Sequence, residues 1–159
     1  MKILAIDPGY DRLGVAVLEK EQGKKEVLMY SDCFQTSSKL TLSERIFLIG
    51  TEVARLIKKY KPDLLAIETL FMTTNQKTVM GVSEARGVII YEASRNNLGI
   101  REFTPLQIKI AVASYGRADK EDVRKMVKRL IVLPEKKQID DEIDAIAVGL
   151  TAFAHERSL

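Results

Sequence analysis

Two short apolar runs, each ending in an acidic residue, constrain the fold of this chain more than any other feature. Residues 2–7 read Lys-Ile-Leu-Ala-Ile-Asp, and residues 64–68 read Leu-Leu-Ala-Ile-Glu. Apolar runs of this length without polar alternation are typical of parallel strands that are covered on both faces. The turn signal Asp7-Pro8-Gly9 ends the first run. We therefore expect a central sheet with helices on both of its faces.

The order of the remaining elements indicates an α/β fold. Residues 13–19 and 27–34 are predicted strands, so the chain opens with a β-meander. Strand and helix patterns then alternate: a strand is expected at 99–103, and helices are expected at 41–60, 75–96, 106–113, 119–130 and 140–156. Strands followed by such alternation predict a mixed central β-sheet flanked by helices on both faces. Because no repeat, low-complexity tract or linker interrupts the pattern, we predict a single domain over residues 1–159.

Composition excludes several classes of protein. Hydrophobic residues make up 46% of the chain and charged residues 30%, which is typical of a globular protein and not of a disordered one. No apolar run approaches the ~20 residues of a membrane helix, and the apolar start of the chain is too short for a signal peptide. We therefore expect a cytoplasmic protein with no membrane partner. The net charge of +3 permits a polyanionic partner without requiring one, since a thermophile's ion-pair surface has a similar composition.

Four acidic residues lie where structural roles do not explain all of them. Asp7 and Glu68 end the two buried strands, and ligands of α/β sheets gather beyond such carboxyl ends. Asp7 alone would be an ordinary turn residue, whereas Glu is disfavoured in strands. Asp141 and Asp144 share one face of the last predicted helix. The helix dipole accounts for acids in its first turn, but Asp144 precedes an apolar stretch and has no Lys or Arg within one helical turn. A divalent cation would satisfy this carboxylate.

Few residue types in this chain could bind a metal ion through nitrogen or sulfur, which limits the kinds of metal ion to expect. Cys33 and His155 are the only residues of their types, so a metal ion would have to be held by carboxylates. We expect Cys33 to be a small buried hydrophobic residue. Carboxylate oxygens suit hard ions such as Mg²⁺ and Mn²⁺. Two such ions at one site are the usual apparatus for in-line cleavage of a phosphodiester.

Together with further motifs, these residues resemble the RuvC family of Holliday-junction resolvases within the RNase H-like superfamily. The similarity holds in order and spacing from residue 3 to about residue 150. Its motifs are Asp7-Pro8-Gly9, Gly14-Val15-Ala16-Val17, Glu68-x-x-Phe71-Met72-x-x-Asn75, Ala85-Arg86-Gly87, Thr104-Pro105-Leu106-Gln107-Ile108-Lys109, Tyr115-Gly116-Arg117-Ala118-Asp119-Lys120 and Asp141-x-x-Asp144-Ala145. The opening motif alone is weak evidence, whereas the full series is specific.

The resemblance implies an Mg²⁺-dependent crossover junction endodeoxyribonuclease. It implies two Mg²⁺ ions in each active site, replaceable by Mn²⁺, and a homodimer that cuts two strands of like polarity in a four-way DNA junction. It also implies partnership with the junction-processing proteins RuvA and RuvB. The implied metal-binding catalytic acids are Asp7, Glu68, Asp141 and Asp144. The implied DNA-binding residues are Phe71, which would stack on a base at the crossover, and Lys109 and Lys120, which would contact phosphates.

Several assignments leave an alternative open. Asp140 is also a helix neighbour of Asp144, and the Asp-x-x-Asp spacing of the family favours Asp141 over it. From the sequence alone, Phe71 reads as part of a hydrophobic staple. The two lysines could be merely solvated, and Arg86 could serve a structural ion pair or an interface.

The helix predicted at 75–96 is the best candidate for a dimer surface. One of its faces can pack on the sheet, and three further apolar positions exceed what one core contact requires. Those positions are Met80, Val88 and Ile90. Another helix of the same chain could instead cover them.

Three other functions compete with junction resolution. A nuclease resembling the YqgF family shares the opening motif, but the motifs around Glu68 and Asp141 argue against it. An actin-like ATPase also opens with a strand and an acidic phosphate loop, yet 159 residues leave no room for its second lobe. A module that binds branched DNA without cutting would be expected to lack at least one of the four acids, and all four are present.

Overall fold

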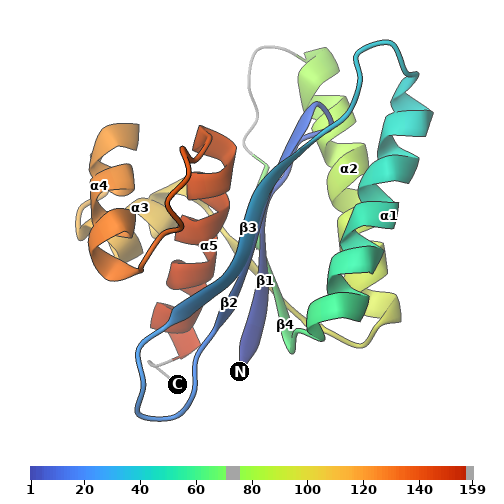
Figure 1. The fold of residues 1–159 in the computed structure, drawn as a ribbon. Helices are drawn as coiled ribbons and strands as arrows, with labels where there is room; N and C mark the ends of the chain where they lie inside the picture. Colours follow the sequence, from blue (N-terminus) through green and yellow to red (C-terminus); the bar gives the residue numbers. More distant parts are fainter. Residues whose placement is uncertain (71–75, 157–159) are drawn as a thin grey trace.

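The computed structural model describes residues 1–70 and 76–156, which form one five-stranded sheet between two helical layers (Figure 1). The strands are β1 (Lys2–Asp7), β2 (Arg12–Glu19), β3 (Val27–Gln35), β4 (Leu64–Glu68) and β5 (Gly99–Phe103). The helices are α1 (Leu42–Tyr60), α2 (Gln76–Arg95), α3 (Pro105–Ala113), α4 (Lys120–Leu130) and α5 (Asp140–Glu156). Every predicted strand and helix is present, close to its predicted ends.

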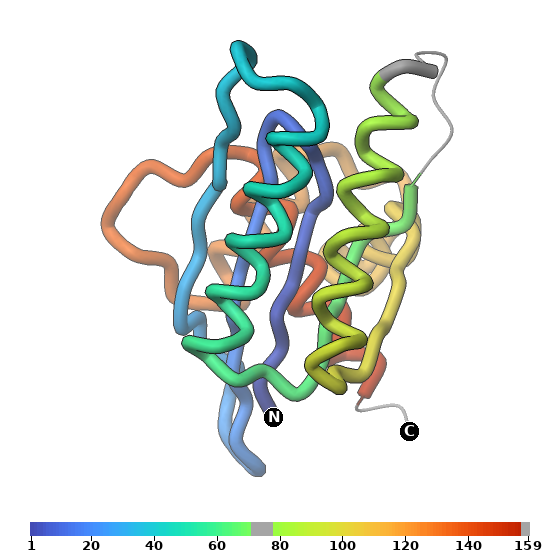
Figure 2. Tube along the Cα trace, turned by 90° about the vertical axis from the view of Figure 1, so that its right-hand side faces the viewer, coloured from blue at the N-terminus to red at the C-terminus, as the bar shows by residue number. Residues whose placement is uncertain are grey.

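The sheet is mixed, as predicted, with strand order β3-β2-β1-β4-β5. The opening meander pairs antiparallel, whereas β1 pairs parallel with β4, and β4 pairs parallel with β5. Helices α1 and α2 lie side by side over one face, and α3, α4 and α5 cover the other (Figures 1 and 2). Both faces of β1 and β4 are therefore buried, which explains the apolar runs at residues 2–6 and 64–67.

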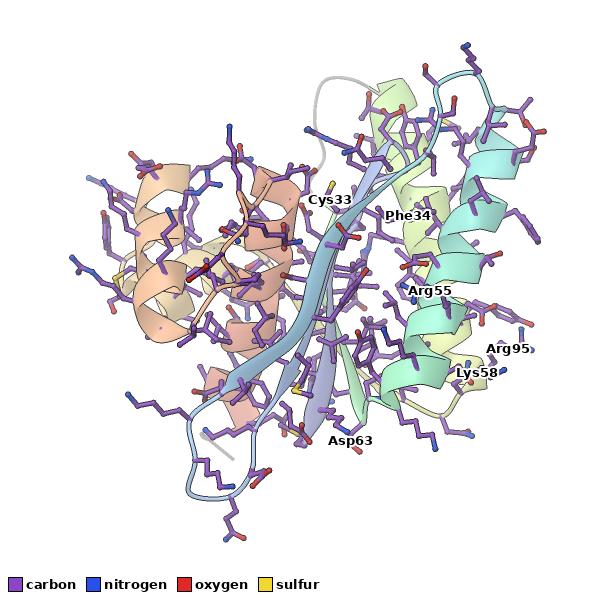
Figure 3. All side chains as sticks on the ribbon, viewed as in Figure 1. Cys33, Phe34, Arg55, Lys58, Asp63 and Arg95 are labelled. Atoms are coloured by element: carbon purple, nitrogen blue, oxygen red, sulfur yellow. The ribbon has the colours of Figure 1, made fainter. Side chains whose placement is uncertain are left out.

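Alternation along the strands divides the interior into two cores (Figure 3). In β1, Ile3 and Ala5 belong to the core under α5, whereas Leu4 and Ile6 belong to the core under α1 and α2. Successive strand residues point to opposite faces, so Asp7 points to the same side as Ile3 and Ala5. The parity of β4 sends Glu68 to that side too, because Leu64 and Ala66 lie in the core under α5.

Small residues let α5 approach the sheet closely. A side-chain carbon added at Gly149 would lie 2.4 Å from a methyl carbon of Leu18 and 3.2 Å from Cβ of Ala5. This close approach buries nearly the whole of α5 after Asp144. Among the described residues, no helix is long and apolar enough to cross a membrane.

Candidate active site

A row of aligned residues runs across β4, β1, β2 and β3. It lies at the end of the sheet where the carboxyl ends of β1 and β4 are close to α5. Asp7 lies opposite Gly14 of β2, which in turn lies opposite Cys33 of β3. On the other side of β1, Ile6 aligns with Ile67, so the next residues along the two strands are Asp7 and Glu68. The two acids predicted to converge therefore do so, through the parallel pairing of their strands.

Gly14 allows the first turn of α5 to reach this row. A Cβ atom built on Gly14 would lie 2.0 Å from the backbone oxygen of Asp141 and 3.2 Å from Cβ of Asp7. Any larger residue at this position would push the helix away from the sheet. The glycine thus brings Asp141 and Asp144 to the acids of the strands.

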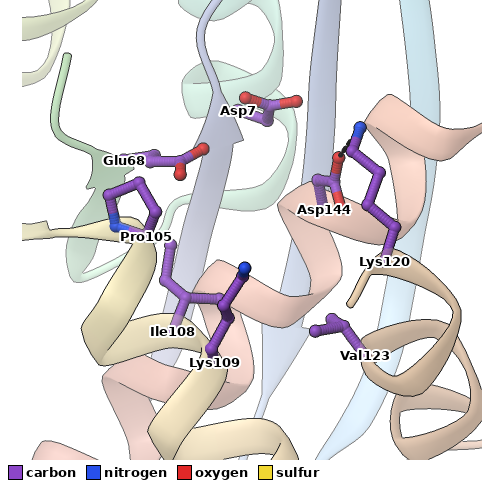
Figure 4. A pocket seen from close by; sticks show the side chains of 8 residues that line it. All are labelled: Asp7, Glu68, Pro105, Ile108, Lys109, Lys120, Val123 and Asp144. Atoms are coloured by element: carbon purple, nitrogen blue, oxygen red, sulfur yellow. Dashed lines mark ion pairs between the residues drawn. The ribbon is translucent and has the colours of Figure 1, made fainter. Parts of the chain in front are cut away.

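The acids border a cavity of about 340 Å³ between the strand ends and helices α3, α4 and α5 (Figure 4). Its polar lining comprises three of the four predicted acids and both predicted lysines: Asp7, Glu68, Asp144, Lys109 and Lys120. Pro105, Ile108 and Val123 form an apolar wall. The fourth acid, Asp141, does not line the cavity, although its charge raises the pKa of Asp7.

Each acid of α5 has a cationic partner from another element. Lys120 Nζ lies 3.5 Å from Asp144 Oδ2, and Arg12 Nε lies 3.4 Å from Asp141 Oδ2. Asp144 has no Lys or Arg within one helical turn, as the sequence indicates, but it has a basic partner on another helix, so a divalent cation is not its only possible partner. The sequence gives no sign of this pair, because Lys120 lies on α4 and reaches Asp144 only through the packing of α4 near α5.

Burial and the neighbouring acids keep Asp7 protonated at neutral pH. Burial is the largest cause, and together with the charges of Glu68, Asp144 and Asp141 it raises the pKa of Asp7 from 3.8 to about 8. Burial also raises the pKa of Glu68 and that of Asp144, against the opposing effect of Lys120. Asp7 and Glu68 share a hydrogen bond that favours the proton on Asp7. At neutral pH the site thus holds excess carboxylate groups that lack compensating charge.

Asp140 and Asp141 point in different directions. The Asp140 side chain is 63% exposed and its Oδ1 lies 3.1 Å from Arg124 Nη1 of α4. The Asp141 side chain is only 18% exposed, and its Oδ2 is buried without a hydrogen-bond partner. A buried carboxylate oxygen without a hydrogen-bond partner supports Asp141, not Asp140, as the residue that faces the site.

This orphaned oxygen and the carboxylate-only donor set fit a hard divalent cation. As the side chains stand, however, no three acidic, cysteine or histidine residues among the described parts of the chain are close enough to hold one ion. Two of the acids, Asp141 and Asp144, instead form ion pairs with Arg12 and Lys120. Side chains of the site would therefore have to move when a metal ion binds.

The structure describes two of the remaining residues singled out in the sequence, Arg86 and Cys33, but not Phe71. Phe71 lies outside the described residues, three positions beyond Glu68 at the end of β4. Arg86 forms an ion pair with Glu102 of β5, which supports its structural interpretation. Cys33 is buried, as predicted, and burial raises the pKa of its thiol to about 11. Arg12 was missed by the sequence analysis, since a residue after a turn carries no signal of proximity to the last helix.

The surface predicted for a dimer is covered only in part. Val88 and Ile90 are half-buried, and Val88 lies beside Gly50 of α1, so the same chain shields it. Met80 remains 64% exposed. Two further exposed apolar side chains of this layer are Phe47 of α1 and Tyr91 of α2, at 72% and 60%, and both border one shallow groove with Val88.

Comparison with known proteins identifies the family of this sequence. The family model described as "Crossover junction endodeoxyribonuclease RuvC" matches residues 3–152. The protein of that name from Caldicellulosiruptor saccharolyticus is 43% identical over 150 residues, covering 94% of this chain and 90% of the relative. The one from Halothermothrix orenii is 45% identical with the same coverage.

Solved structures agree with these matches. "T. thermophilus RuvC in complex with Holliday junction substrate" superposes with a TM-score of 0.92 at 28% identity, covering 99% of this chain and 96% of that one. The yeast mitochondrial Holliday junction resolvase Ydc2 shares the fold, with a TM-score of 0.69 at 14% identity over 98% of this chain and 77% of the other. The RNase H-like fold expected from the sequence is confirmed.

Proposed function

The chain belongs to the RuvC family of crossover junction endodeoxyribonucleases, and we infer that it resolves Holliday junctions by cutting two strands of like polarity during recombination and repair. The main support for this function is the match of the family model to residues 3–152. The fold also aligns over nearly its full length with a RuvC bound to a Holliday junction. The same matches disfavour the YqgF-like and non-cleaving alternatives. The acid-lined cavity supports hydrolysis as the chemistry.

We propose that Asp7, Glu68, Asp141 and Asp144 are the catalytic acids and hold two Mg²⁺ ions, which Mn²⁺ can replace. Support comes from the three acids that line one cavity, from the effect of the nearby Asp141 charge on Asp7, and from the Asp141 oxygen that has no hydrogen-bond partner. When bound, two such ions lower the pKa of an attacking water and stabilise the leaving 3′ oxygen. To become a ligand, the Asp7 carboxyl must release the proton that it holds at neutral pH.

Lys109 and Lys120 are proposed to position the scissile strand. Lys109 lines the cavity from α3, and Lys120 lines it from the first position of α4, with 79% of its side chain exposed. Both are therefore available to a phosphate, and neutralising a phosphate with a lysine releases a condensed counterion.

Phe71 is proposed to stack on a base at the crossover. In sequence it follows Glu68, the last residue of β4 and one of the acids that line the cavity, by three positions. Stacking of an aromatic ring on an unpaired base contributes about 1–3 kcal/mol.

We propose a symmetric homodimer that works with RuvA and RuvB. A two-fold enzyme presents one active site to each of two equivalent strands of a junction. The exposed Phe47 and Tyr91 support the outer surface of α1 and α2 as the contact. Phe47→Glu should yield a folded monomer by sedimentation, because Phe47 lies largely outside the core. A Phe47→Glu variant that remains dimeric would place the contact elsewhere.

Cleavage of a synthetic four-way junction tests the function. Wild-type protein should make paired nicks with Mg²⁺ and none with EDTA. The variants Glu68→Gln, Asp141→Asn and Asp144→Asn should bind the junction but not cut it, whereas Asp140→Asn, which removes an exposed neighbouring acid, should cut normally. Binding without cutting by the wild-type protein would instead support a non-cleaving module. Cutting by Asp141→Asn together with loss in Asp140→Asn would reverse the assignment of the third ligand.

A further inference from the structure

Arg12 places a half-exposed cation at the rim of the acidic site. Its Nε atom lies 3.4 Å from Asp141 Oδ2, yet that oxygen accepts no hydrogen bond, and 56% of the Arg12 side chain is exposed. Among the described residues, the guanidinium forms no hydrogen bond with any other side chain. Arg12 is therefore attracted by charge to Asp141 but is not locked to it by hydrogen-bond geometry.

The backbone beneath Arg12 is held firmly. Arg45 of α1 pairs with Asp11, the preceding residue, and Thr36 binds the turn twice: its backbone N–H donates to the Asp11 carbonyl at 3.0 Å, and its Oγ1 donates to the Tyr10 carbonyl at 2.5 Å. A Cβ atom on Gly9 would lie 2.2 Å from the Arg12 carbonyl oxygen, so the turn folds tightly against this residue. The chain thus fixes the origin of a long side chain whose charged end remains free to move.

Arg12 and Lys120 occupy equivalent electrostatic positions. Each comes from a different element and pairs with one of the two proposed catalytic acids on α5, Asp141 or Asp144. A divalent cation at Asp141 would stand where the guanidinium now neutralises the carboxylate. Two positive groups that share one carboxylate repel each other, and the one that is free to move is displaced.

We propose that Arg12 is a counter-cation that competes with the divalent metal for Asp141 and, once displaced, binds a phosphate of the junction DNA. The inference rests on the proposed function, since it needs both a metal and DNA at this site. A guanidinium suits the second role because its forked N–H groups match phosphate oxygens and its charge persists at all working pH values. Such an exchange would couple metal loading to DNA binding, because each cation that enters the site releases Arg12 to the substrate.

Two binding measurements on Arg12→Gln test the exchange, each with Ca²⁺ as a probe ion. Isothermal titration of the DNA-free protein should show Ca²⁺ binding about fivefold tighter than in wild type, because a positive charge near the metal has been removed. Binding of a four-way junction in saturating Ca²⁺ should be about three- to tenfold weaker, with a salt slope smaller by about 1. Arg12→Lys should lie between wild type and Arg12→Gln in the DNA assay, because it retains the charge but loses the fork.

A matched control is available in Arg101→Gln. Arg101 is 49% exposed and its Nε lies 3.2 Å from Glu156, far along α5 from the acids, so its loss should change neither affinity. Opposite changes in the two affinities of Arg12→Gln would support the exchange. Affinities that move in the same direction, or an unchanged value of either one, would overturn it. Failure of the wild-type protein to bind Ca²⁺ or junctions would instead refute the proposed function on which the inference rests.

Discussion

Replacing Asp7 with Asn should stabilise the metal-free protein while abolishing its nuclease activity. In the folded chain, burial and three neighbouring acids raise the pKa of Asp7 to about 8, against 3.8 for an unperturbed group. The folded state therefore binds a proton at pH 7 that the unfolded state has released. Stability falls as pH rises between these two values, because in this window the folded state is the one that binds more protons.

The size of the effect follows from that window. Between pH 3.8 and pH 7, the free energy of unfolding falls by about 1.4 kcal/mol for each pH unit, because only the folded state keeps the Asp7 proton. The buried position of Asp7 therefore lowers the free energy of unfolding at pH 7 by about 4 kcal/mol. Asparagine removes the titration, and its amide can still donate a hydrogen bond to Glu68. We expect Asp7→Asn to raise the free energy of unfolding by about 2–4 kcal/mol, and a gain of this order raises Tm by about 4–16 °C in a chain of this length.

Urea denaturation in EDTA, followed by circular dichroism at several pH values, measures the prediction. The gain should nearly vanish below pH 4, grow through pH 7, and level off above about pH 8, where Asp7 is ionised in the folded protein as well. Asp140→Asn is the control, since an exposed ion pair with Arg124 contributes at most about 1 kcal/mol. Millimolar Mg²⁺ should narrow or reverse the difference, because only the wild type keeps all four ligands. An Asp7→Asn protein that is less stable than wild type at pH 7, or a gain that does not depend on pH, would refute the reasoning.

Three further predictions concern the approach of α5, the aromatic residue and the lysines. Gly14→Ala should destabilise the protein by about 1–3 kcal/mol and reduce cleavage, because the new Cβ would lie 2.0 Å from the Asp141 backbone oxygen. Thermal melts measure the loss of stability, and an unchanged Tm would show that α5 can shift to make room for the new side chain. Phe71→Ala should bind junctions but cut them slowly, and a junction opened at its centre should restore part of the rate; a lower Tm with normal cutting would favour the hydrophobic staple. Lys109→Ala and Lys120→Ala should each reduce, by about 1, the slope of log affinity for the junction against log salt concentration, without altering the preferred cleavage sequence. Unchanged slopes would indicate that both lysines are solvated surface residues that do not contact phosphates.

Local patterns in the sequence determined the elements and half of the site. Hydrophobic period, caps and turn residues predicted all five strands and all five helices described in the structure, because these signals act between residues close in the chain. The strand ends at Asp7 and Glu68, and the helical spacing of Asp141 and Asp144, are properties of the same kind. They already indicated carboxylates that gather at the carboxyl edge of a sheet.

Contacts between distant segments were decided only by the tertiary structure. No local signal pairs Lys120 with Asp144 or Arg12 with Asp141, because each pair depends on how α4 and the start of β2 pack near α5. The exposure of Phe47 and the shielding of Val88 likewise depend on how α1 lies beside α2. Charge balance within the site is thus a property of the packed molecule: the chain specifies which acids meet, and packing determines which cations accompany them.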